Sequence, residues 1–254
     1  TLFTLLPSEE TGINFINKVQ NSKEFNIFKY RNFYNGGGVA IGDINNDGLS
    51  DVFLTGNMEP NKLYLNKGDL KFEDISEAAG IAGNKPWSTG VVMADINNDG
   101  LLDIYVSNAG NMEGNNHDND LFINNGNGTF TENAHEFNLA ETGFSTHASF
   151  FDYDKDGDLD AYILNNSNIP VSSLGYAEQR DVRAQDWEGV PKIFRGVGDM
   201  LLRNDNGKFV DVSEKAGIYG SLIGFGLGVM VIDINNDLYP DIYVSNDFYE
   251  RDYL

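Results

Sequence analysis

The pattern of hydrophobic and polar positions repeats along the chain. A short apolar run leads into a turn rich in Asp and Asn, a second apolar run follows, and this order occurs four times. The first Asp of the turn falls at positions 43, 95, 152 and 233. Short apolar runs separated by Gly, Asn and Asp are typical of β-strands joined by tight hairpins. The pattern therefore predicts a repeated antiparallel β structure.

A second element follows each of the first three copies. It spans 61–81, 119–140 and 198–218, whereas in the fourth copy only "RDYL" follows. Each full repeat thus supplies four strands, which we name A to D in chain order. Strands A and B are almost continuously apolar, so we expect them inside and covered on both faces, with strands C and D outside. The segments "SEAAGI" and "SEKAGI" fit one helical turn each.

The predicted fold class is all-β. Four-stranded antiparallel units of roughly 50 residues indicate the blades of a β-propeller, an architecture built by radial repetition. The 254 residues are expected to form a single propeller domain, or part of one, with about four blades. The third repeat is stretched by an insertion at 167–197. The repeats span about 35–81, 90–140, 147–218 and 228–254, the last of them incomplete.

The turn between strands A and B resembles the front half of an EF-hand loop. An EF-hand needs a bidentate Glu at loop position 12 and a helix on either side. Counted from the first Asp, position 12 is Leu54, Val106, Ile163 or Val244, and each of these lies in the predicted strand B. The turn is therefore not an EF-hand.

A nine-residue loop fits the same stretch. Positions 1, 3, 5 and 9 supply side-chain oxygens, and position 7 offers a backbone carbonyl or, in the third copy, an Asp. Oxygen ligands without His or Cys favour calcium, and magnesium ranks second because it requires tighter octahedral geometry and more water. The alternative is an ordinary Asp-rich hairpin turn, but several carboxylates in one turn repel one another without a cation. The predicted ligands are Asp43, Asn45, Asp47, Leu49 and Asp51; Asp95, Asn97, Asp99, Leu101 and Asp103; Asp152, Asp154, Asp156, Asp158 and Asp160; and Asp233, Asn235, Asp237, Tyr239 and Asp241.

Position 6 of the loop separates the fourth copy from the others. Gly permits a sharp turn with positive φ and is present as Gly48, Gly100 and Gly157, whereas the fourth copy has Leu238. We therefore expect three to four calcium ions, with the fourth loop binding weakly, binding in altered geometry or staying empty. Bound metal should contribute to the folding of each A–B hairpin.

The pattern D-x-[DN]-x-D-G-x-x-D between apolar strands resembles the FG-GAP/VCBS repeats, which are the calcium-binding blades of integrin α-subunit propellers and of many bacterial surface proteins. The resemblance covers about 35–254. The segment "NKLYLNKGDLKFEDISEAAGI" is similar to the bacterial branch related to cartilage acidic protein. The resemblance implies a propeller of seven blades or a similar number. It also implies export to the extracellular space or a bacterial outer-membrane surface, often with a lipid anchor.

Antiparallel strand order separates the metal loops from the long connections. The A–B and C–D turns share one face, and the B–C and D–A connections, including 107–119 and the insertion, share the other. Long loops are where recognition is expected, and Trp or Tyr beside polar groups stack on sugars or anchor proteins. Packing of Trp87 between blades, and of Trp187 within the insertion, is the structural alternative. The ligand-face candidates are Trp87, His117, Tyr176, Arg180, Arg183, Asp186 and Trp187.

Composition narrows the classes of function. The formal net charge of -22 disfavours nucleic acid and anionic membranes as partners and attracts cations. The chain has no Cys, which excludes disulfides and thiolate metal sites. No apolar run approaches the roughly 18 residues of a membrane span. Membrane association is therefore expected only through an upstream lipid anchor or a membrane-protein partner.

The sequence predicts a calcium-stabilised, non-catalytic module at the cell surface that binds a protein or a glycan. The Gly-rich stretch 224–229 opens a strand and lacks a dinucleotide-binding context, and no nucleophile motif is present. His147 lies in strand A of the third copy and is expected to be structural. The alternative is a polysaccharide-active lyase or hydrolase, which would need a central pocket with a carboxylate of raised pKa, a Tyr or an Arg pair, around the axis on the face opposite the metal loops.

Overall fold

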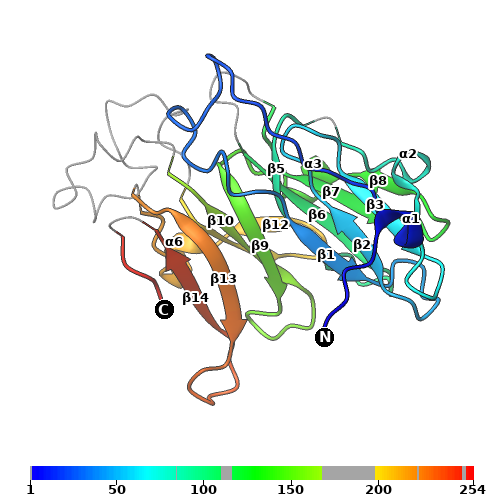
Figure 1. Cartoon of the computed structure of the whole chain (residues 1–254). Coiled ribbons are helices and arrows are strands. Elements are labelled where there is room, and N and C mark those ends of the chain that lie inside the picture. The colour runs from blue at the N-terminus through cyan, green and yellow to red at the C-terminus, as the bar shows by residue number, and fades with distance from the viewer. Residues whose placement is uncertain (1, 84, 110–115, 168–197, 222, 248–249) are drawn as a thin grey trace.

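The computed structural model describes residues 2–83, 85–109, 116–167, 198–221, 223–247 and 250–254. Its strands form antiparallel sheets that fan out side by side (Figure 1). We call them blade 1 (β1–β4), blade 2 (β5–β8), blade 3 (β9–β12) and blade 4 (β13 and β14). The strands are β1 (Val39–Gly42), β2 (Asp51–Leu54), β3 (Lys62–Asn66), β4 (Phe72–Asp74), β5 (Ser88–Ala94), β6 (Asp103–Asn108), β7 (Asp120–Asn124), β8 (Phe130–Glu132), β9 (Ser145–Phe151), β10 (Asp160–Asn165), β11 (Met200–Asn204), β12 (Phe209–Asp211), β13 (Gly226–Ile232) and β14 (Asp241–Asn246).

The blades meet along their first strands. β1 lies beside β5, β5 beside β9, and β9 beside β13, so strand A is the inner strand of each blade. Within blades 1 to 3 the strands follow in chain order from A to D. In blade 4, Val244 of β14 pairs with Tyr253 in an isolated antiparallel bridge, at the place that strand C takes in the other blades. The all-β prediction and the blade-like order of strands are confirmed, and the sheets do not close into a barrel.

The hydrophobic core lies in layers between neighbouring blades. One cluster joins blades 1 and 2 and includes Phe53 and Ile104, and a second joins blades 2 and 3 and includes Tyr105 and Ile163. A third includes Tyr162 and joins blades 3 and 4. Each layer forms because strand B is apolar on both faces, and every residue of β6 and β10 is buried.

The inner strands are less covered than the sequence predicted. In β1, Val39 and Ile41 are 60% and 65% exposed, while Ala40 between them is buried. In β13, Met230 is 53% exposed. The expectation that strand A is covered on both faces is therefore wrong for these two strands. The physical reason is that β1 and β13 are the first and last inner strands, so one side of each has no neighbouring sheet among the described residues.

One-turn helices follow strand D, as "SEAAGI" and "SEKAGI" predicted. Each ends at a residue in the left-handed region, such as Gly80 (φ 76°) after α2, and this conformation commonly terminates helices. The N-terminal segment begins with the same kind of turn, α1, which ends at Gly12 (φ 81°), but residues 2–7 form no strand. The helices are α1 (Ser8–Thr11), α2 (Ser76–Ala79), α3 (Ala134–Phe137) and α6 (Ser213–Ala216).

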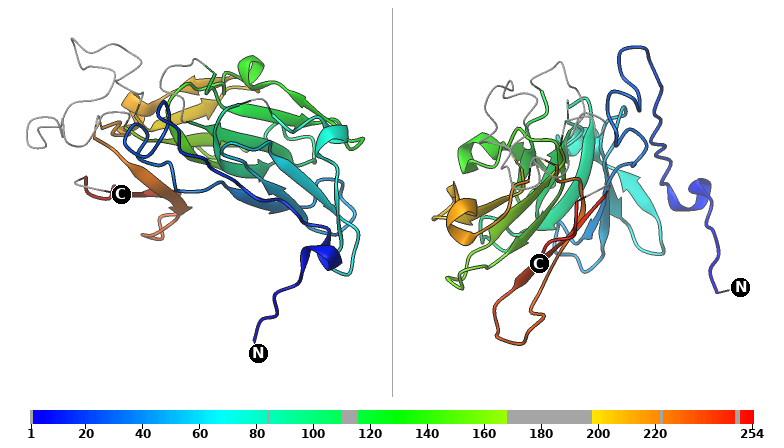
Figure 2. Two further views of the ribbon diagram at one scale, coloured as in Figure 1. Left: turned by 45° about the horizontal axis from the view of Figure 1, so that its top comes forward. Right: turned by 90° about the vertical axis from the view of Figure 1, so that its left-hand side faces the viewer.

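A long N-terminal segment, residues 13–38, crosses from α1 at the outer edge of blade 1 to the inner strand β1 (Figure 2). It is anchored where Asn17 Nδ2 donates to Asn57 Oδ1 at 2.7 Å. Its aromatic residues then pack around Trp87, with Phe33 and Tyr30 centroids 5.1 and 5.6 Å from that ring. This segment covers part of the molecule's face opposite the A–B loops.

No described helix is long and apolar enough to cross a membrane. The predicted insertion lies between β10 and β11, and all of it after residue 167 falls outside the described residues. β5, β9 and β13 begin at 88, 145 and 226, two residues before the predicted repeat starts at 90, 147 and 228.

Candidate functional site

The four A–B loops share one hydrogen-bond pattern. In the first, Asp43 Oδ1 accepts the N–H of Asp47 (3.1 Å) and Oδ2 accepts that of Gly48 (2.7 Å). Asp47 Oδ1 in turn accepts the N–H of Leu49 at 2.8 Å. The same three bonds recur in the other three loops. The carboxylates at positions 1 and 5 therefore hold the turn together by accepting backbone N–H groups of the loop. The N–H of the position-7 residue is one of these, and it is donated to the carboxylate at position 5.

Position 6 adopts the predicted positive φ in every loop. Its φ is 86° at Gly48, 87° at Gly100 and 100° at Gly157. Leu238 adopts φ 71° and keeps the hydrogen bonds of the other loops, although this conformation is costly for a residue with a Cβ. The fourth loop is therefore not rearranged by the loss of Gly.

The last Asp of each of the first three loops connects the loop to strand C of its blade. Asp51 is fully buried, its Oδ2 accepts the N–H of Ile44 (3.0 Å), and its Oδ1 accepts the N–H of Asn66 at the end of β3 (2.7 Å). Asp103 and Asp160 accept the equivalent pairs of N–H groups. The sequence assigned position 9 to the metal alone and missed this role, although the Asn that ends each strand C was a visible signal.

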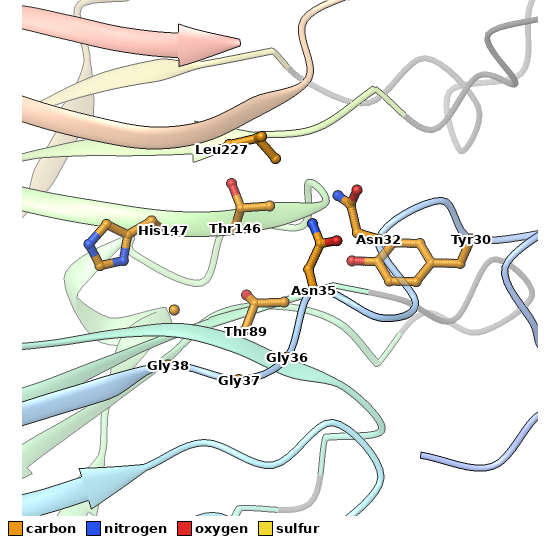
Figure 3. A pocket seen from close by; sticks show the side chains of 11 residues that line it. Tyr30, Asn32, Asn35, Gly36, Gly37, Gly38, Thr89, Thr146, His147 and Leu227 are labelled. Atoms are coloured by element: carbon orange, nitrogen blue, oxygen red, sulfur yellow. The ribbon is translucent and has the colours of Figure 1, made fainter. Parts of the chain in front are cut away.

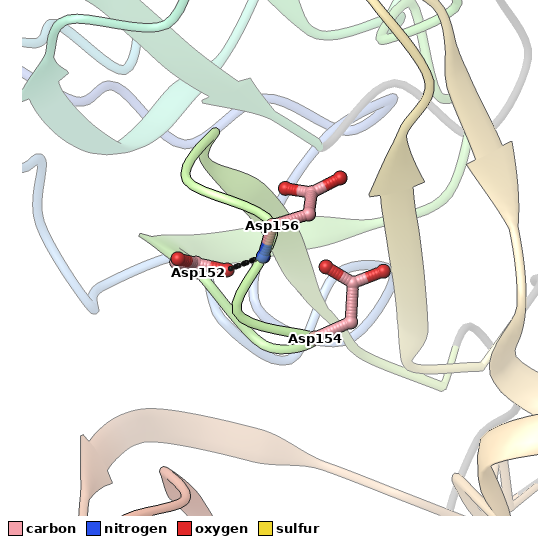
Figure 4. A group of neighbouring side chains, drawn as sticks. All are labelled: Asp152, Asp154 and Asp156. Carbon is pink, nitrogen blue, oxygen red and sulfur yellow. Dashed lines mark hydrogen bonds between the residues drawn. The ribbon is translucent and has the colours of Figure 1, made fainter.

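The third loop has the densest set of acidic groups. One oxygen from each of Asp152, Asp154 and Asp156 lies within 4.8 Å of the others, and Figure 4 shows the three side chains around the turn. Asp158 at position 7 has a buried Oδ1 without a hydrogen-bond partner in the described structure. Asp160 is not part of this convergent group, because its carboxylate is engaged by backbone N–H groups.

Burial and mutual repulsion raise the pKa of several loop carboxyl groups. The pKa of Asp158 is raised to about 6, first by burial and then by Asp156 and Asp160. The pKa of Asp103 is also raised to about 6, mainly by burial and against the backbone N–H groups that it accepts. A cation among these groups would remove the repulsion between them.

Neighbouring loops touch one another along the face that the A–B loops share. Asn46 Nδ2 donates to Gly100 O at 3.2 Å, which links the first loop to the second. Lys155 Nζ lies 3.5 Å from the centroid of the Tyr239 ring, which links the third loop to the fourth. Tyr239, predicted only as a backbone ligand, thus also has a side-chain contact of the cation–π type.

The ligand-face candidates divide into buried and undescribed residues. Trp87 is 1% exposed in the aromatic cluster of the N-terminal segment, so its expected place on a ligand-binding surface is corrected. The reason is that no local sequence pattern indicates that residues 13–38 fold over this ring. His117 is 7% exposed, stacks on Phe144 at 5.2 Å and has Nε2 2.8 Å from Thr142 O. The remaining candidates lie outside the described residues: Tyr176, Arg180, Arg183, Asp186 and Trp187.

Comparison with known families identifies the repeats. A family model described as FG-GAP-like repeat matches residues 26–106 and 109–163, which together make up more than half of the chain. The matched residues include the first three A–B loops. This match agrees with the resemblance indicated by the loop pattern.

Two curated relatives are similar to part of this chain. The chain is 42% identical over 78 residues to cartilage acidic protein 1 of Xenopus tropicalis and 40% identical over 76 residues to that of Homo sapiens. Each match covers 30% of this chain and 12% of the relative, so the chain spans only a small part of those proteins.

One solved structure is loosely similar. It concerns specific recognition of non-reducing terminal N-acetylglucosamine by an Agrocybe aegerita lectin and shares 17% identity, with a TM-score of 0.39 over 80% of this chain and 45% of that one. A likeness at this TM-score supports no argument about a ligand.

Proposed function

Because this chain belongs to the FG-GAP-like repeat family, we propose that it is a calcium-stabilised, non-catalytic binding module. In this proposal the A–B loops hold calcium on one face, and the opposite face recognises a protein or glycan partner. The metal has a structural role, because the loops that hold it are separated from the opposite face by the length of the inner strands.

The observation that carries the metal proposal is the third loop. Its donors are all oxygens, three carboxylates converge within 4.8 Å, and a buried oxygen of Asp158 lacks a partner. Such a set fits a hard cation that takes six to eight oxygens, and calcium fits better than magnesium because the loop supplies many ligands itself. Asp152, Asp154, Asp156 and Asp158 would hold the ion, which would neutralise their mutual repulsion.

The other loops support three to four sites in total. They keep the same backbone fold with an Asn at position 3, at Asn45, Asn97 and Asn235, and so carry one carboxylate fewer at that position than the third loop. Affinity for calcium rises with ligand charge. We therefore expect the third loop to bind most tightly among the four.

We also propose an exported location, on the cell surface or outside the cell. The support is the resemblance of the loop pattern to FG-GAP/VCBS repeats, which implies export. A net charge of -22 supports partners other than nucleic acid or bare anionic membrane. An upstream lipid anchor or a membrane-protein partner would provide membrane association.

No specific observation favours the enzymatic alternative. Outside the loops, Asp120 and Asp199 have carboxyl pKa values raised by burial to about 6 and about 7. Neither lines the pocket at the inner strands, whose described lining contains no carboxyl group. The described lining of that pocket therefore offers no pair of carboxyl groups for acid–base cleavage of a polysaccharide.

Thermal unfolding in calcium and in EGTA tests the proposal. At a calcium concentration about 100 times the dissociation constant, each site adds about 2.7 kcal/mol to the free energy of unfolding. For a chain of this size that corresponds to roughly 5–10 °C per site. Magnesium at the same concentration should give a smaller shift. An unchanged melting temperature, with no calcium retained after desalting, would show that the proposal is wrong.

Matched variants assign the effect to the loop. Asp156→Ala removes a ligand and should abolish the contribution of the third site. Asp154→Asn creates the residue that the other loops carry at position 3, so calcium should still bind there, only more weakly. Equal losses in both variants would point to general destabilisation instead of metal binding.

A further inference from the structure

A pocket opens at the start of the inner strands, on the face opposite the A–B loops. It has a volume of about 230 Å³ and is formed by residues 30–38 of the N-terminal segment and by the first residues of β5, β9 and β13 (Figure 3). Three blades and the N-terminal segment therefore meet around it. We call it the axial pocket.

The hydroxyl of Tyr30 is the first sign of a missing partner in the axial pocket. Tyr30 is 5% exposed, and its hydroxyl is buried without a protein partner at hydrogen-bond geometry in the described structure. Its ring is fixed by stacking on Phe25 (5.8 Å) and by an edge contact with Trp87 (5.6 Å). Figure 3 shows the hydroxyl directed toward the side of Asn35. A buried hydroxyl without a partner costs about 1–3 kcal/mol, which a ligand that accepts or donates a hydrogen bond would recover.

His147 is the second sign, because it breaks the repeat at the axial pocket. The position five residues before the first loop Asp is Gly38, Gly90 and Gly228 in three copies and His147 in the third. His147 lines the pocket against Gly90, where an added Cβ would lie 2.5 Å from His147 Nδ1. The imidazole of His147 thus occupies space beside Gly90, where a side chain on the neighbouring blade would otherwise lie.

The lining of the axial pocket is neutral and rich in hydrogen-bonding groups. The side-chain amides of Asn32 and Asn35 each offer donors and an acceptor. Asn32 also lies close enough to Tyr30 to lower the pKa of that phenol slightly, against the larger rise caused by burial. Burial lowers the pKa of His147, which keeps its ring uncharged near neutral pH. No Asp, Glu, Lys or Arg belongs to the described lining.

The floor of the axial pocket is rigid. The hydroxyl of Thr89 donates to Ser145 O at 2.7 Å, and that of Thr146 donates to Gly226 O at 2.9 Å. These bonds join adjacent inner strands across blade boundaries. The Thr oxygens can still accept hydrogen bonds from a ligand.

We propose that the axial pocket binds one neutral sugar residue. Its volume of about 230 Å³ equals that of roughly eight water molecules in the liquid and lies below the range typical of drug-sized ligands. A sugar ring of this size presents hydroxyls that both donate and accept, which match two amides, a phenol and a neutral imidazole. An amino acid or a phosphate would require charged partners that the lining lacks. This inference rests on the proposed recognition role of the face opposite the calcium loops, and it names that face's ligand class.

Titration of the full-length, calcium-loaded protein with a panel of methyl glycosides tests the proposal. Saturation-transfer NMR identifies the bound sugar, and calorimetry or a chemical-shift titration gives its affinity. We expect at least one neutral hexoside or N-acetylhexosaminide to bind with a dissociation constant of about 1 mM or lower. Gluconate and methyl phosphate serve as charged probes of similar or smaller size and should not bind.

Variants of the pocket residues separate ligand binding from folding. Tyr30→Phe removes only the hydroxyl and should weaken sugar binding about tenfold while leaving the melting temperature of the free protein equal or higher. Tyr34→Phe is the matched control, because Tyr34 is 59% exposed outside the pocket and accepts a surface hydrogen bond from Asn21. His147→Gly, which restores the repeat residue, should also weaken binding.

Several outcomes would overturn the proposal. No response to any glycoside at 20-fold above the expected dissociation constant, or preferential binding of the charged probes, would reject a neutral-sugar site. Unchanged affinity in Tyr30→Phe would reject the axial pocket as its location. A protein that gains stability from calcium but fails these tests contradicts only the pocket proposal. Sugar binding without any calcium effect contradicts only the metal proposal.

Discussion

At the scale of single residues, Leu238 shows how the fourth loop tolerates a departure from the repeat. Its φ of 71° lies in the left-handed region, where the equivalent residues are Gly48, Gly100 and Gly157. Its side chain is 77% exposed and contributes little packing. The loop therefore keeps its shape despite backbone strain of about 1–2 kcal/mol for a residue with a Cβ.

Restoring Gly should relieve this strain. We expect Leu238→Gly to raise the free energy of unfolding by about 0.5–1 kcal/mol, after part of the gain is offset by the greater chain entropy of Gly. Gly48→Leu should lower it by a similar or larger amount, since a Cβ at Gly48 meets nothing within 4 Å and only the backbone is strained. Urea unfolding in saturating calcium measures both. A loss of stability in Leu238→Gly would refute the strain argument.

Asp199 is a second residue that departs from the repeat. It is buried, with 8% of its surface exposed, just before β11, where its Oδ1 accepts the N–H of Asn165 (2.9 Å) and its Oδ2 accepts the hydroxyl of Tyr162 (3.0 Å). Asn61 and Asn119 stand at this place in blades 1 and 2. Burial raises the pKa of Asp199 from 3.8 to about 7, so the folded protein retains its proton at pH values where the unfolded chain has lost it.

The difference in the pKa of Asp199 between the folded and unfolded protein makes the free energy of unfolding depend on pH. Stability linked to Asp199 is greatest below about pH 4, declines as the pH rises to about 7, and is constant above that. We expect Asp199→Asn to raise the free energy of unfolding by about 2–4 kcal/mol at pH 8 and to leave it nearly unchanged at pH 4. Denaturant titrations of both proteins across this range give the difference. A variant that is less stable at pH 8 would contradict the expectation.

At the scale of elements, the Asn that ends strand C connects that strand to the A–B loop in blades 1 to 3. Asn66, Asn124 and Asn204 donate their backbone N–H to the last loop Asp, and their side-chain amides donate to the carbonyl before it. Asn124 makes one bond more, from Nδ2 to Ile44 O of blade 1 at 2.8 Å. This side chain therefore connects two blades as well as two elements of its own.

The additional hydrogen bond of Asn124 can be tested by comparing the alanine variants of Asn124 and Asn66. Asn124→Ala leaves the buried carbonyl of Ile44 without this donor, whereas Asn66→Ala breaks bonds only within blade 1. We expect Asn124→Ala to lower the free energy of unfolding by about 1–2 kcal/mol more than Asn66→Ala. Equilibrium unfolding of the two variants in calcium supplies the comparison. Equal costs would mean that the bond between blades contributes nothing.

The sequence predicted elements best where their chemistry is local. Strands A to D, the turn at Gly48 and the helical turn of 76–79 depend on neighbouring residues, so pattern and turn chemistry were enough. The N-terminal segment was not predicted, because its fold depends on packing Tyr30 and Phe33 against Trp87, far away in the sequence. His147 was read as structural, although its replacement of a repeated Gly was visible in the alignment of the four copies.

At the scale of the whole molecule, the blades form an open row whose inner strands lie side by side (Figure 1). Exposed apolar residues at both ends, such as Ile41 in β1 and Met230 in β13, are surfaces of the kind that neighbouring blades cover elsewhere in the structure. A total of seven blades stays a prediction from the family resemblance. The family itself is confirmed by the match over residues 26–106 and 109–163.

In the proposed function, stabilisation by metal and recognition of a ligand lie on opposite faces of the molecule. Acidic loops gather on one face, and the neutral axial pocket lies at the other end of the inner strands. Because position 9 of each of the first three loops is bound to strand C, an ion held by the same loop would stabilise the whole blade and not only a hairpin. The sequence located the loops correctly, whereas the ligand face depended on contacts between distant segments that no local pattern reveals.

The most direct measurement is an anomalous difference map from a crystal of the protein grown in calcium. We expect a peak in the third loop about 2.3–2.6 Å from oxygens of Asp152, Asp154 and Asp156, with peaks in the equivalent positions of the other loops. A third loop that shows no peak at saturating calcium, with its carboxylates still bound only to backbone N–H groups, would contradict the account.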